Sequence, residues 1–216
     1  MSEVILYDHP MSGNCLKVQM FLTVLGVPNR AAFVGLAKGA SREDWFLQLN
    51  PFGQVPVIHD GDIIVRDSQA ILTYLALKQD PSWFGRDFAE SEMIAEWLSF
   101  AAKEVSNGPQ MARLYYYHLP GEQIDIDRAT KLSIDALAVL ESAMLDQDWL
   151  VAARSTIADI AVFLDIGLIH EAHLDLADYP RVKALIERIA NLPGYVAIRG
   201  LPGYQPRDGE NLPLPA

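Results

Sequence analysis

The sequence has a single cysteine, Cys15, among its 216 residues. One cysteine excludes an intrachain disulfide and a CxxC redox pair, and scarce cysteine is typical of the reducing cytosol. Long apolar runs are also missing, because none approaches the ~20 residues of a membrane-spanning helix. The first residues lack the basic stretch and the apolar core of a signal peptide. We therefore expect a cytoplasmic protein that has no membrane partner.

Basic side chains are scarce as well. Seventeen Lys and Arg stand against 28 Asp and Glu, which gives a net charge of −11 and a pI near 4.8. That sign disfavours binding to nucleic acids and to anionic membrane surfaces. Half of the residues are apolar, which argues against a disordered chain. A chain of this length can bury the core of one large domain or of two small ones.

The acidic excess is uneven along the chain. Residues 1–80 carry 6 basic and 8 acidic side chains, whereas residues 81–216 carry 11 and 20. The local pattern changes at the same place, where Asp80-Pro81 ends a helical stretch because proline cannot continue a helix. We predict two domains, at residues 1–80 and 88–216, the second with an irregular tail from Gly209 to Ala216.

Short β-branched runs alternate with helical stretches in residues 1–80. Asp60-Gly61 between two apolar runs is a strong hairpin signal, and Ser41 followed by Asp44 resembles a capping box that opens a helix. The predicted order is β-α-β-α-β-β-α, which favours a mixed sheet with helices on its faces. Strands are expected at residues 4–7, 31–34, 55–59 and 63–65, and helices from about Asn14 to Gly26, up to Leu49, and from Ser68 to Leu77.

Two of these helices begin at positions suited to binding an anion, near Asn14 and near Ser68. The unpaired N–H groups of a helix start can hold an anionic group. Pro56 lies within a strand pattern, and because proline cannot donate to a strand ladder, it marks a sheet edge, a bulge or a cis peptide bond.

Residues 81–216 have the pattern of successive helices. Gly108-Pro109 is expected to kink or interrupt one of them. In the Tyr115–His118 segment at least one tyrosine must be exposed or line a cleft, because three adjacent tyrosines cannot all face one core. Residues 157–169 are apolar nearly all round, which predicts the buried centre of this half. A core stripe at helical spacing consists of Ile94, Trp97, Leu98, Ala101 and Val105.

Four short motifs follow one another along the chain. Ser12-Gly13-Asn14-Cys15 follows the first strand, and Asn50-Pro51-Phe52-Gly53-Gln54-Val55-Pro56 precedes Asp67-Ser68-Gln69-Ala70-Ile71. In the second half come Ser155-Thr156-Ile157-Ala158-Asp159-Ile160-Ala161 and Asn191-Leu192-Pro193-Gly194-Tyr195. In residues and in order, these motifs resemble cytosolic glutathione S-transferases, in particular the bacterial serine-type members that are nu-like or theta-like.

This resemblance implies an α/β thioredoxin-like N-terminal domain, an all-α helical C-terminal domain and a homodimer. It implies a detoxifying enzyme that adds the thiolate of its cosubstrate glutathione to a small electrophile. The thiolate is the nucleophile, and a free thiol with a pKa of ~8.5 is little ionised at neutral pH. Ser12 is the catalytic hydroxyl donor that the motif matches, and Asn14 adds an amide donor in some bacterial members.

The resemblance also implies where glutathione binds. Asp67, where the family usually has Glu, and Ser68 would hold the γ-glutamyl end, although an ordinary N-cap pair also explains both residues. A cis Val55–Pro56 bond, which the family shows, would turn the backbone groups of Val55 toward the cysteinyl part. Candidates for the glycine end are Gln54, Arg42 and Lys38.

Tyr7 and Cys15 compete with Ser12 for the catalytic role, because relatives use a tyrosine near the end of the first strand or a cysteine in this turn. We predict instead that Tyr7 is an ordinary strand residue and that Cys15 is a small buried thiol. The same bound thiolate also suits a disulfide reductase or a peroxidase. A non-catalytic interaction module with the same fold is the third possibility.

Two acidic or metal-binding features in the second half have structural interpretations. Asp159 is predicted to be the acid of a capping box that begins at Thr156. His170 and His173 lie three residues apart, but no Cys, Asp or Glu cluster completes a site around them. We therefore predict no metal.

Overall fold

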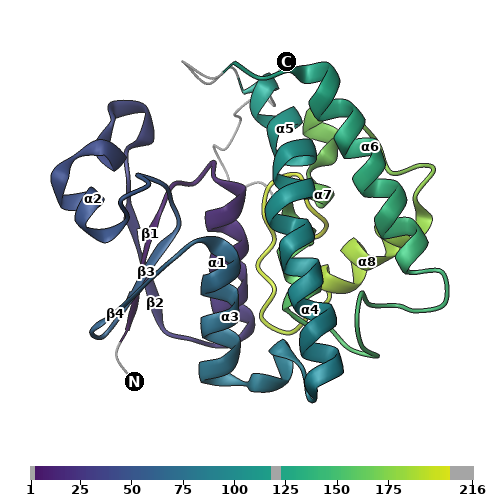
Figure 1. Ribbon diagram of the computed structural model, residues 1–216, viewed down its shortest axis with the longest axis horizontal. Helices are drawn as coiled ribbons and strands as arrows, with labels where there is room; N and C mark the ends of the chain where they lie inside the picture. Colours follow the sequence, from purple (N-terminus) through teal and green to yellow (C-terminus); the bar gives the residue numbers. More distant parts are fainter. Residues whose placement is uncertain (1–2, 118–122, 205–216) are drawn as a thin grey trace.

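The computed structural model describes residues 3–117 and 123–204, with a sheet and three helices on one side of an array of further helices (Figure 1). The sheet has the strand order β2-β1-β3-β4; β1 is parallel to β2 and antiparallel to β3. The predicted order of elements and the mixed sheet are confirmed. These elements are β1 (Val4–Asp8), α1 (Gly13–Val24), β2 (Asn29–Phe33), α2 (Asp44–Leu49), β3 (Val57–Asp60), β4 (Ile63–Arg66) and α3 (Ser68–Gln79).

The side chains of β1 alternate between the two faces of the sheet, as the geometry of a strand requires. Leu6, which pairs with Ala31 and Ile58, is fully buried in the core that also contains residues of α1 and α3. Tyr7 points to the opposite face and packs on the smaller cluster around Phe46 of α2. Figure 1 shows the same division, with α2 on one side of the sheet and α1 and α3 on the other.

The predicted capping box at Ser41 is wrong. Ser41 is buried in a short 3₁₀ turn (Ala40–Arg42), and α2 begins only after Glu43. The Glu43 side chain caps no backbone group of the helix, because its carboxylate accepts a hydrogen bond from the indole of Trp45 at 2.8 Å. Strand β2 is also shifted, since it begins two residues before the expected Ala31.

The second part is helical, and its first three segments form one long rod (Figure 1). Of the predicted kink or interruption at Gly108-Pro109, the interruption is wrong, because the chain stays helical through both residues. The hydrogen bonding is π-type from Ala101 to Gln110, a departure from α-helical geometry that includes Pro109. The helices are α4 (Phe88–Phe100), the π-helical η4 (Ala101–Gln110), α5 (Met111–Tyr116), α6 (Ile126–Ala143), α7 (Ile157–Gly167) and α8 (Pro180–Ala190).

Helix α7 is the buried centre of the helical half, as predicted. Every residue from Ile157 to Ile166 is buried, and the helix packs against both α1 and α4. The capping box predicted for Thr156 and Asp159 is present. One apolar core therefore continues from the sheet through α1 and α7 into the helical array.

Most of the predicted α4 stripe is buried, but Trp97 is not in the core. Its ring is half-buried against the edge of the core and packs edge-to-face on Phe100, with 5.2 Å between the ring centroids. Tyr115 is 39% exposed, which confirms that the three tyrosines do not share one core. His118 and the predicted tail from Gly209 lie outside the described residues.

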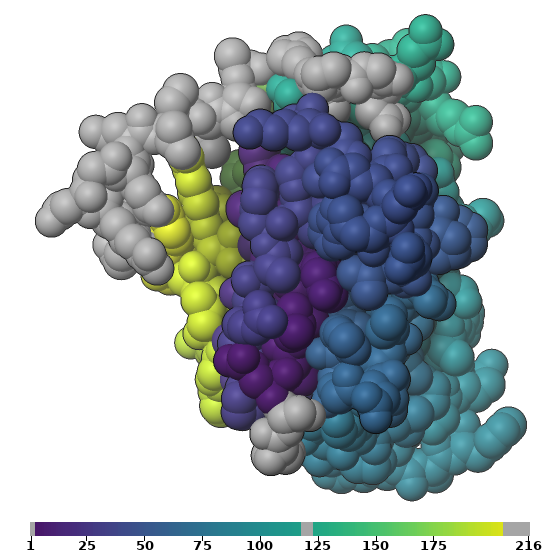
Figure 2. All heavy atoms as spheres, turned by 90° about the vertical axis from the view of Figure 1, so that its left-hand side faces the viewer, coloured from purple at the N-terminus to yellow at the C-terminus, as the bar shows by residue number. Residues whose placement is uncertain are grey.

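The segment after α8 returns to the first part of the chain. Gly194 has a φ of +80°, and an added Cβ would lie 2.6 Å from the carbonyl oxygen of Thr23 at the end of α1. Only glycine permits that approach. Figure 2 shows this C-terminal segment beside the N-terminal elements. Within residues 3–117 and 123–204, no helix combines the length and the apolar character needed to cross a membrane.

Candidate active site

The first component of the candidate site is the start of α1. Ser12 is the N-cap, and its Oγ accepts a hydrogen bond from the backbone N–H of Cys15 at 3.4 Å. An accepted bond uses a lone pair of the hydroxyl and leaves its O–H able to donate. The cap is an ordinary one, and it also fixes the Ser12 hydroxyl beside the positive end of the α1 dipole.

The second component is the start of α3. Asp67 is its N-cap, and Oδ1 accepts hydrogen bonds from Gln69 N–H at 2.9 Å and Ala70 N–H at 3.1 Å. The φ of Asp67 is +70°, in a region that non-glycine residues rarely adopt. Such backbone strain concentrates at ligand-binding positions. Ser68, the next residue, is buried.

A hydrogen bond joins the two helix starts. The hydroxyl of Ser68 donates to Oδ1 of Asn14 at 3.1 Å. Because Oδ1 is the acceptor in this bond, the NH₂ group of Asn14 is available as a donor to a ligand. The sequence predicted each of these residues separately, and the structure brings them together.

The loop before β3 is the third component. The Val55–Pro56 peptide bond is cis, which is one of the three arrangements expected for Pro56. Gln54 is exposed, and its backbone carbonyl accepts a hydrogen bond from Asn50 Nδ2 at 2.7 Å. Of the other two candidates for the glycine end, Arg42 donates to the carbonyl of Phe52 at 3.1 Å and Lys38 is exposed.

Neither of the two rivals for the catalytic role is a helix cap, since one is buried in α1 and the other lies within β1. Cys15 is fully buried, and burial raises the pKa of its thiol to about 12, although hydrogen bonds with the Ser12 side chain and the His9 backbone oppose the shift. It is the small buried thiol that the sequence predicts. Tyr7 lies within β1, and its ring packs on Phe46 and Trp45 at centroid distances of 6.4 and 6.3 Å.

Charged residues that the sequence analysis missed lie beneath the start of α1. Arg113 of α5 donates to Oδ1 of Asp165 of α7, and through Nε and Nη2 to Oε2 of Glu171 at 3.0 and 2.7 Å. An added Cβ on Gly13 would lie 2.7 Å from the same Asp165 Oδ1. Lys17, also buried, donates to the carbonyl of Ala161 at 3.1 Å. The one available signal was a charge interrupting an otherwise apolar helix face, as Lys17 does in α1 and Asp165 in α7.

The electrostatics of this cluster follow from burial and pairing. Burial opposes the charge of Arg113, but Asp165 and Glu171 together raise the pKa of its guanidinium. Burial lowers the pKa of Lys17, which the Asp165 and Asp67 carboxylates counteract in part. A buried cation is tolerated where such carboxylates compensate it.

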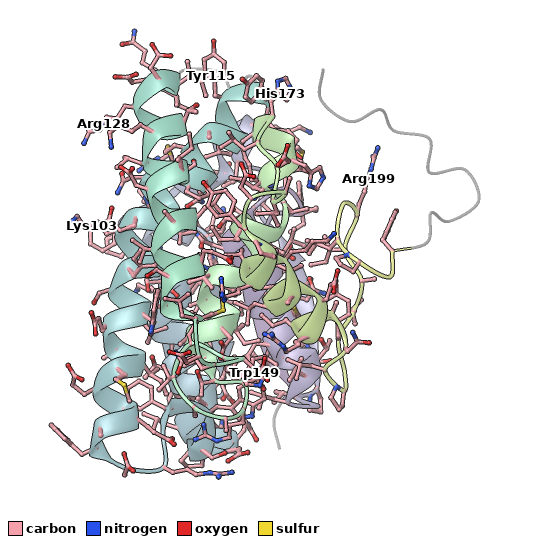
Figure 3. The ribbon with its side chains drawn as sticks, turned by 90° about the vertical axis from the view of Figure 1, so that its right-hand side faces the viewer. Lys103, Tyr115, Arg128, Trp149, His173 and Arg199 are labelled. Atoms are coloured by element: carbon pink, nitrogen blue, oxygen red, sulfur yellow. The ribbon has the colours of Figure 1, made fainter. Side chains whose placement is uncertain are left out.

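Aromatic side chains border the end of α5. Tyr116 stacks on His173 with 4.0 Å between the ring centroids, and Tyr115 packs edge-to-face on Tyr116. Figure 3 shows Tyr115 and His173 at the same end of the helical array. Burial, followed by the Glu171 carboxylate, raises the pKa of Tyr117. Among the described residues, no group of three or more His, Cys, Asp or Glu side chains is arranged to hold a metal.

Together these features define a class of protein: a thioredoxin-like α/β unit with a cis-proline loop and two converging helix starts, fused to an all-helical unit. The family follows from comparisons with known proteins. Residues 11–78 match the family model for the glutathione S-transferase N-terminal domain, and residues 88–193 match the model for the C-terminal domain. The chain belongs to the glutathione S-transferase family.

Individual relatives agree with this assignment. Glutathione S-transferase theta-1 of Bos taurus is 31% identical over 170 residues, which cover 74% of this chain and 71% of that protein. A crystal structure of a glutathione S-transferase from Xanthobacter autotrophicus Py2 matches with a TM-score of 0.83 and 30% identity, over 92% of this chain and 98% of that one. A glutathione transferase homolog from Drosophila mojavensis, solved with bound glutathione, has a TM-score of 0.79 and 27% identity over 89% and 90%.

Proposed function

We propose that this glutathione S-transferase ionises the thiol of glutathione at Ser12 and Asn14 and adds the thiolate to a small electrophile. The observation that carries the proposal is the hydrogen bond from Ser68 to Asn14, because it holds two helix starts at one point and leaves two side-chain donors there. A thiolate at that point receives the hydroxyl of Ser12 and the amide NH₂ of Asn14.

The energy available from these donors is sufficient for the chemistry. A free thiol has a pKa of ~8.5, so a few per cent is ionised at neutral pH. A hydrogen bond to a charged group contributes ~1.5–3 kcal/mol, and a helix N-terminus adds ~0.3–1 kcal/mol. At ~1.4 kcal/mol per unit, the bound thiol is expected to have a pKa lower by ~1–3 units. The thiolate then attacks the electrophile without any nucleophile from the protein.

The other glutathione contacts are proposed from the same geometry. Asp67 would take the γ-glutamyl amine, and Ser68 with the start of α3 would take the carboxylate. The backbone of Val55 would pair with the cysteinyl part, as an added strand does. Gln54 is the proposed contact for the glycine end, and its exposure suits a ligand that lies on the surface of the loop.

The decisive experiment is a titration of the bound thiol. Thiolate absorbance of the glutathione complex is followed against pH for the wild type, Ser12→Ala and Ser12→Thr. We expect the alanine variant to raise the thiol pKa by about one unit or more, and the threonine variant to stay near the wild type because it keeps the hydroxyl. An unchanged titration in Ser12→Ala rejects Ser12 as the donor.

We also propose the domains, assembly, location and subclass. Residues 1–80 would form the thioredoxin-like domain and residues 88–216 the helical domain, in a cytoplasmic homodimer of the nu-like or theta-like serine type.

A second copy would cover the groove of about 490 Å³ between α4 and α6, which is lined mostly by apolar side chains such as Val139. Val139→Glu should then halve the mass in sedimentation, whereas Val196→Glu, a comparably exposed control on the C-terminal segment, should not.

A further inference from the structure

The turn that carries Ser12 and Asn14 rests directly on a buried ion pair. Gly13, between them, has no side chain, and an added Cβ would lie 2.7 Å from Asp165 Oδ1 and 3.3 Å from Arg113 Nη1. The side chains of Arg113 and Asp165 are 7% and 3% exposed. Protein rather than water therefore separates these charges from the turn, and electrostatic interactions are less screened in a protein interior than in water.

The two charges of the pair have opposite effects at the start of α1. A carboxylate near a helix N-terminus stabilises the first turn, so Asp165 supports the backbone of Gly13. The same negative charge disfavours a thiolate bound to that turn. Arg113 pairs with Oδ1 of Asp165, the atom that faces Gly13. Its positive charge thereby offsets the repulsion between the Asp165 carboxylate and a bound thiolate.

We propose that Arg113 and Asp165 are positioning residues that set how strongly the bound thiol ionises. Asp165 holds the first turn of α1 in place, and Arg113 offsets the charge of Asp165. This inference rests on the proposed function, because it places the sulfur at Ser12 and Asn14.

Other charged groups surround the pair, and Glu171 is the one that the test varies. Glu171 is bound to the opposite edge of Arg113, and the atoms nearest an added Cβ on Gly13 belong to Asp165 and Arg113 rather than to Glu171. Lys17 lies one helical turn after Gly13 and interacts with Asp165 and with Asp67. The groups that interact with the pair are Lys17 from α1, Glu171 from the 3₁₀ turn Ile169–Ala172, and Tyr117, which follows α5. Asp67, at the start of α3, interacts with Lys17.

Asp165→Asn and Glu171→Gln form a matched pair of variants. Each replaces a carboxylate that is paired with Arg113 by a neutral amide. The amide keeps the shape of the side chain and one acceptor oxygen. Only Asp165 adjoins the turn, so we expect the pKa of bound glutathione to fall by about 0.5–1 unit in Asp165→Asn and by less than half of that in Glu171→Gln. Thiolate absorbance of the glutathione complex measures both shifts.

Substitution of Arg113 should shift the pKa of the bound thiol in the opposite direction. Arg113→Met leaves the Asp165 charge unbalanced, so the thiol pKa should rise, and Arg113→Lys should recover at least half of that rise because it keeps a cation. If the pair were purely structural, substitution of Arg113 or of Asp165 would lower the stability of the fold but would not shift the thiol pKa in opposite directions. If Arg113→Met does not fold, the comparison of Asp165→Asn with Glu171→Gln decides alone.

The wild-type titration separates the two ways of failing. A bound thiol with the pKa of free glutathione overturns the proposed function. A lowered wild-type pKa, with equal shifts or none in Asp165→Asn and Glu171→Gln, overturns this inference and leaves the proposed function standing. A larger downward shift in Asp165→Asn supports it.

Discussion

The hydroxyl of Ser68 donates a hydrogen bond to Oδ1 of Asn14 at 3.1 Å, and this bond ties the start of α3 to the start of α1. It also fixes the direction of the Asn14 amide. With Oδ1 occupied, the NH₂ group faces away from Ser68 and can donate to a bound anion. A residue proposed to bind glutathione thus also orients a residue proposed to ionise its thiol.

Ser68→Ala should therefore impair both binding and ionisation. The variant loses a donor to the glutathione carboxylate and frees the Asn14 amide to rotate. We expect kcat/KM to fall about tenfold or more, since a bond to a charged group is worth ~1.5–3 kcal/mol. Ser133→Ala is the control, because it removes another buried hydroxyl that bonds only within α6. A loss confined to KM, with the thiol pKa unchanged, would contradict the orienting role.

Gly13→Ala should disrupt the site by steric conflict. The new Cβ would lie 2.7 Å from Asp165 Oδ1, a distance that forces either the turn or the ion pair to move. We expect a loss of stability of about 1–3 kcal/mol and at least a tenfold loss of kcat/KM. Gly35→Ala is the matched control, because its Cβ would meet no atom closer than 3.6 Å and its φ is negative. Equal behaviour of the two variants in urea unfolding and in the conjugation assay would refute the conflict.

Cys15→Ala should leave the conjugation rate within about twofold of the wild type. Burial raises the pKa of Cys15 to about 12, so almost no thiolate exists at neutral pH. For the same reason iodoacetamide should modify the native protein at pH 8 far more slowly than the urea-unfolded chain. Rapid alkylation of the native protein, or loss of activity without loss of fold, would give Cys15 a chemical role.

Local signals in the sequence were enough to place the caps of three helices. Ser12, Asp67 and Thr156 each cap the helix expected there, because a capping side chain bonds to backbone only a few residues away. The Ser41 capping box failed because residues 40–42 form a 3₁₀ turn and α2 begins only after Glu43, so Ser41 is not at the start of the helix.

The support beneath the site could not be predicted in the same way. Arg113 reaches Asp165 and Glu171 across 52 and 58 residues of sequence, and these contacts form because α5 packs against the 3₁₀ turn Ile169–Ala172 that follows α7. In sequence, Arg113 and Glu171 have the appearance of surface charges, and only Asp165 interrupts an apolar helix. Pairing of this kind depends on tertiary packing, which no periodicity encodes.

Asp159 provides a pH-dependent test of the core. Burial, opposed by hydrogen bonds from Leu150 and Thr156, raises its pKa from 3.8 to about 6. A carboxyl whose pKa is higher in the folded state stabilises the fold below its unfolded pKa, and this contribution is lost as the pH rises through the folded pKa. At ~1.4 kcal/mol per unit, the contribution is about 3 kcal/mol, lost between about pH 4 and 6.

Asp159→Asn removes this titration and, in addition, one acceptor, because its NH₂ group cannot accept from the Thr156 N–H as Oδ2 does. The variant should therefore be less stable than the wild type at pH 4, and the difference in the free energy of unfolding should shrink as the pH rises to 7. Urea unfolding of both proteins at several pH values measures this difference, and Asp178→Asn, at an exposed site, controls for the loss of one acid. A difference that stays constant with pH would mean that Asp159 has the same pKa in the folded and unfolded states, with its hydrogen bonds balancing its burial.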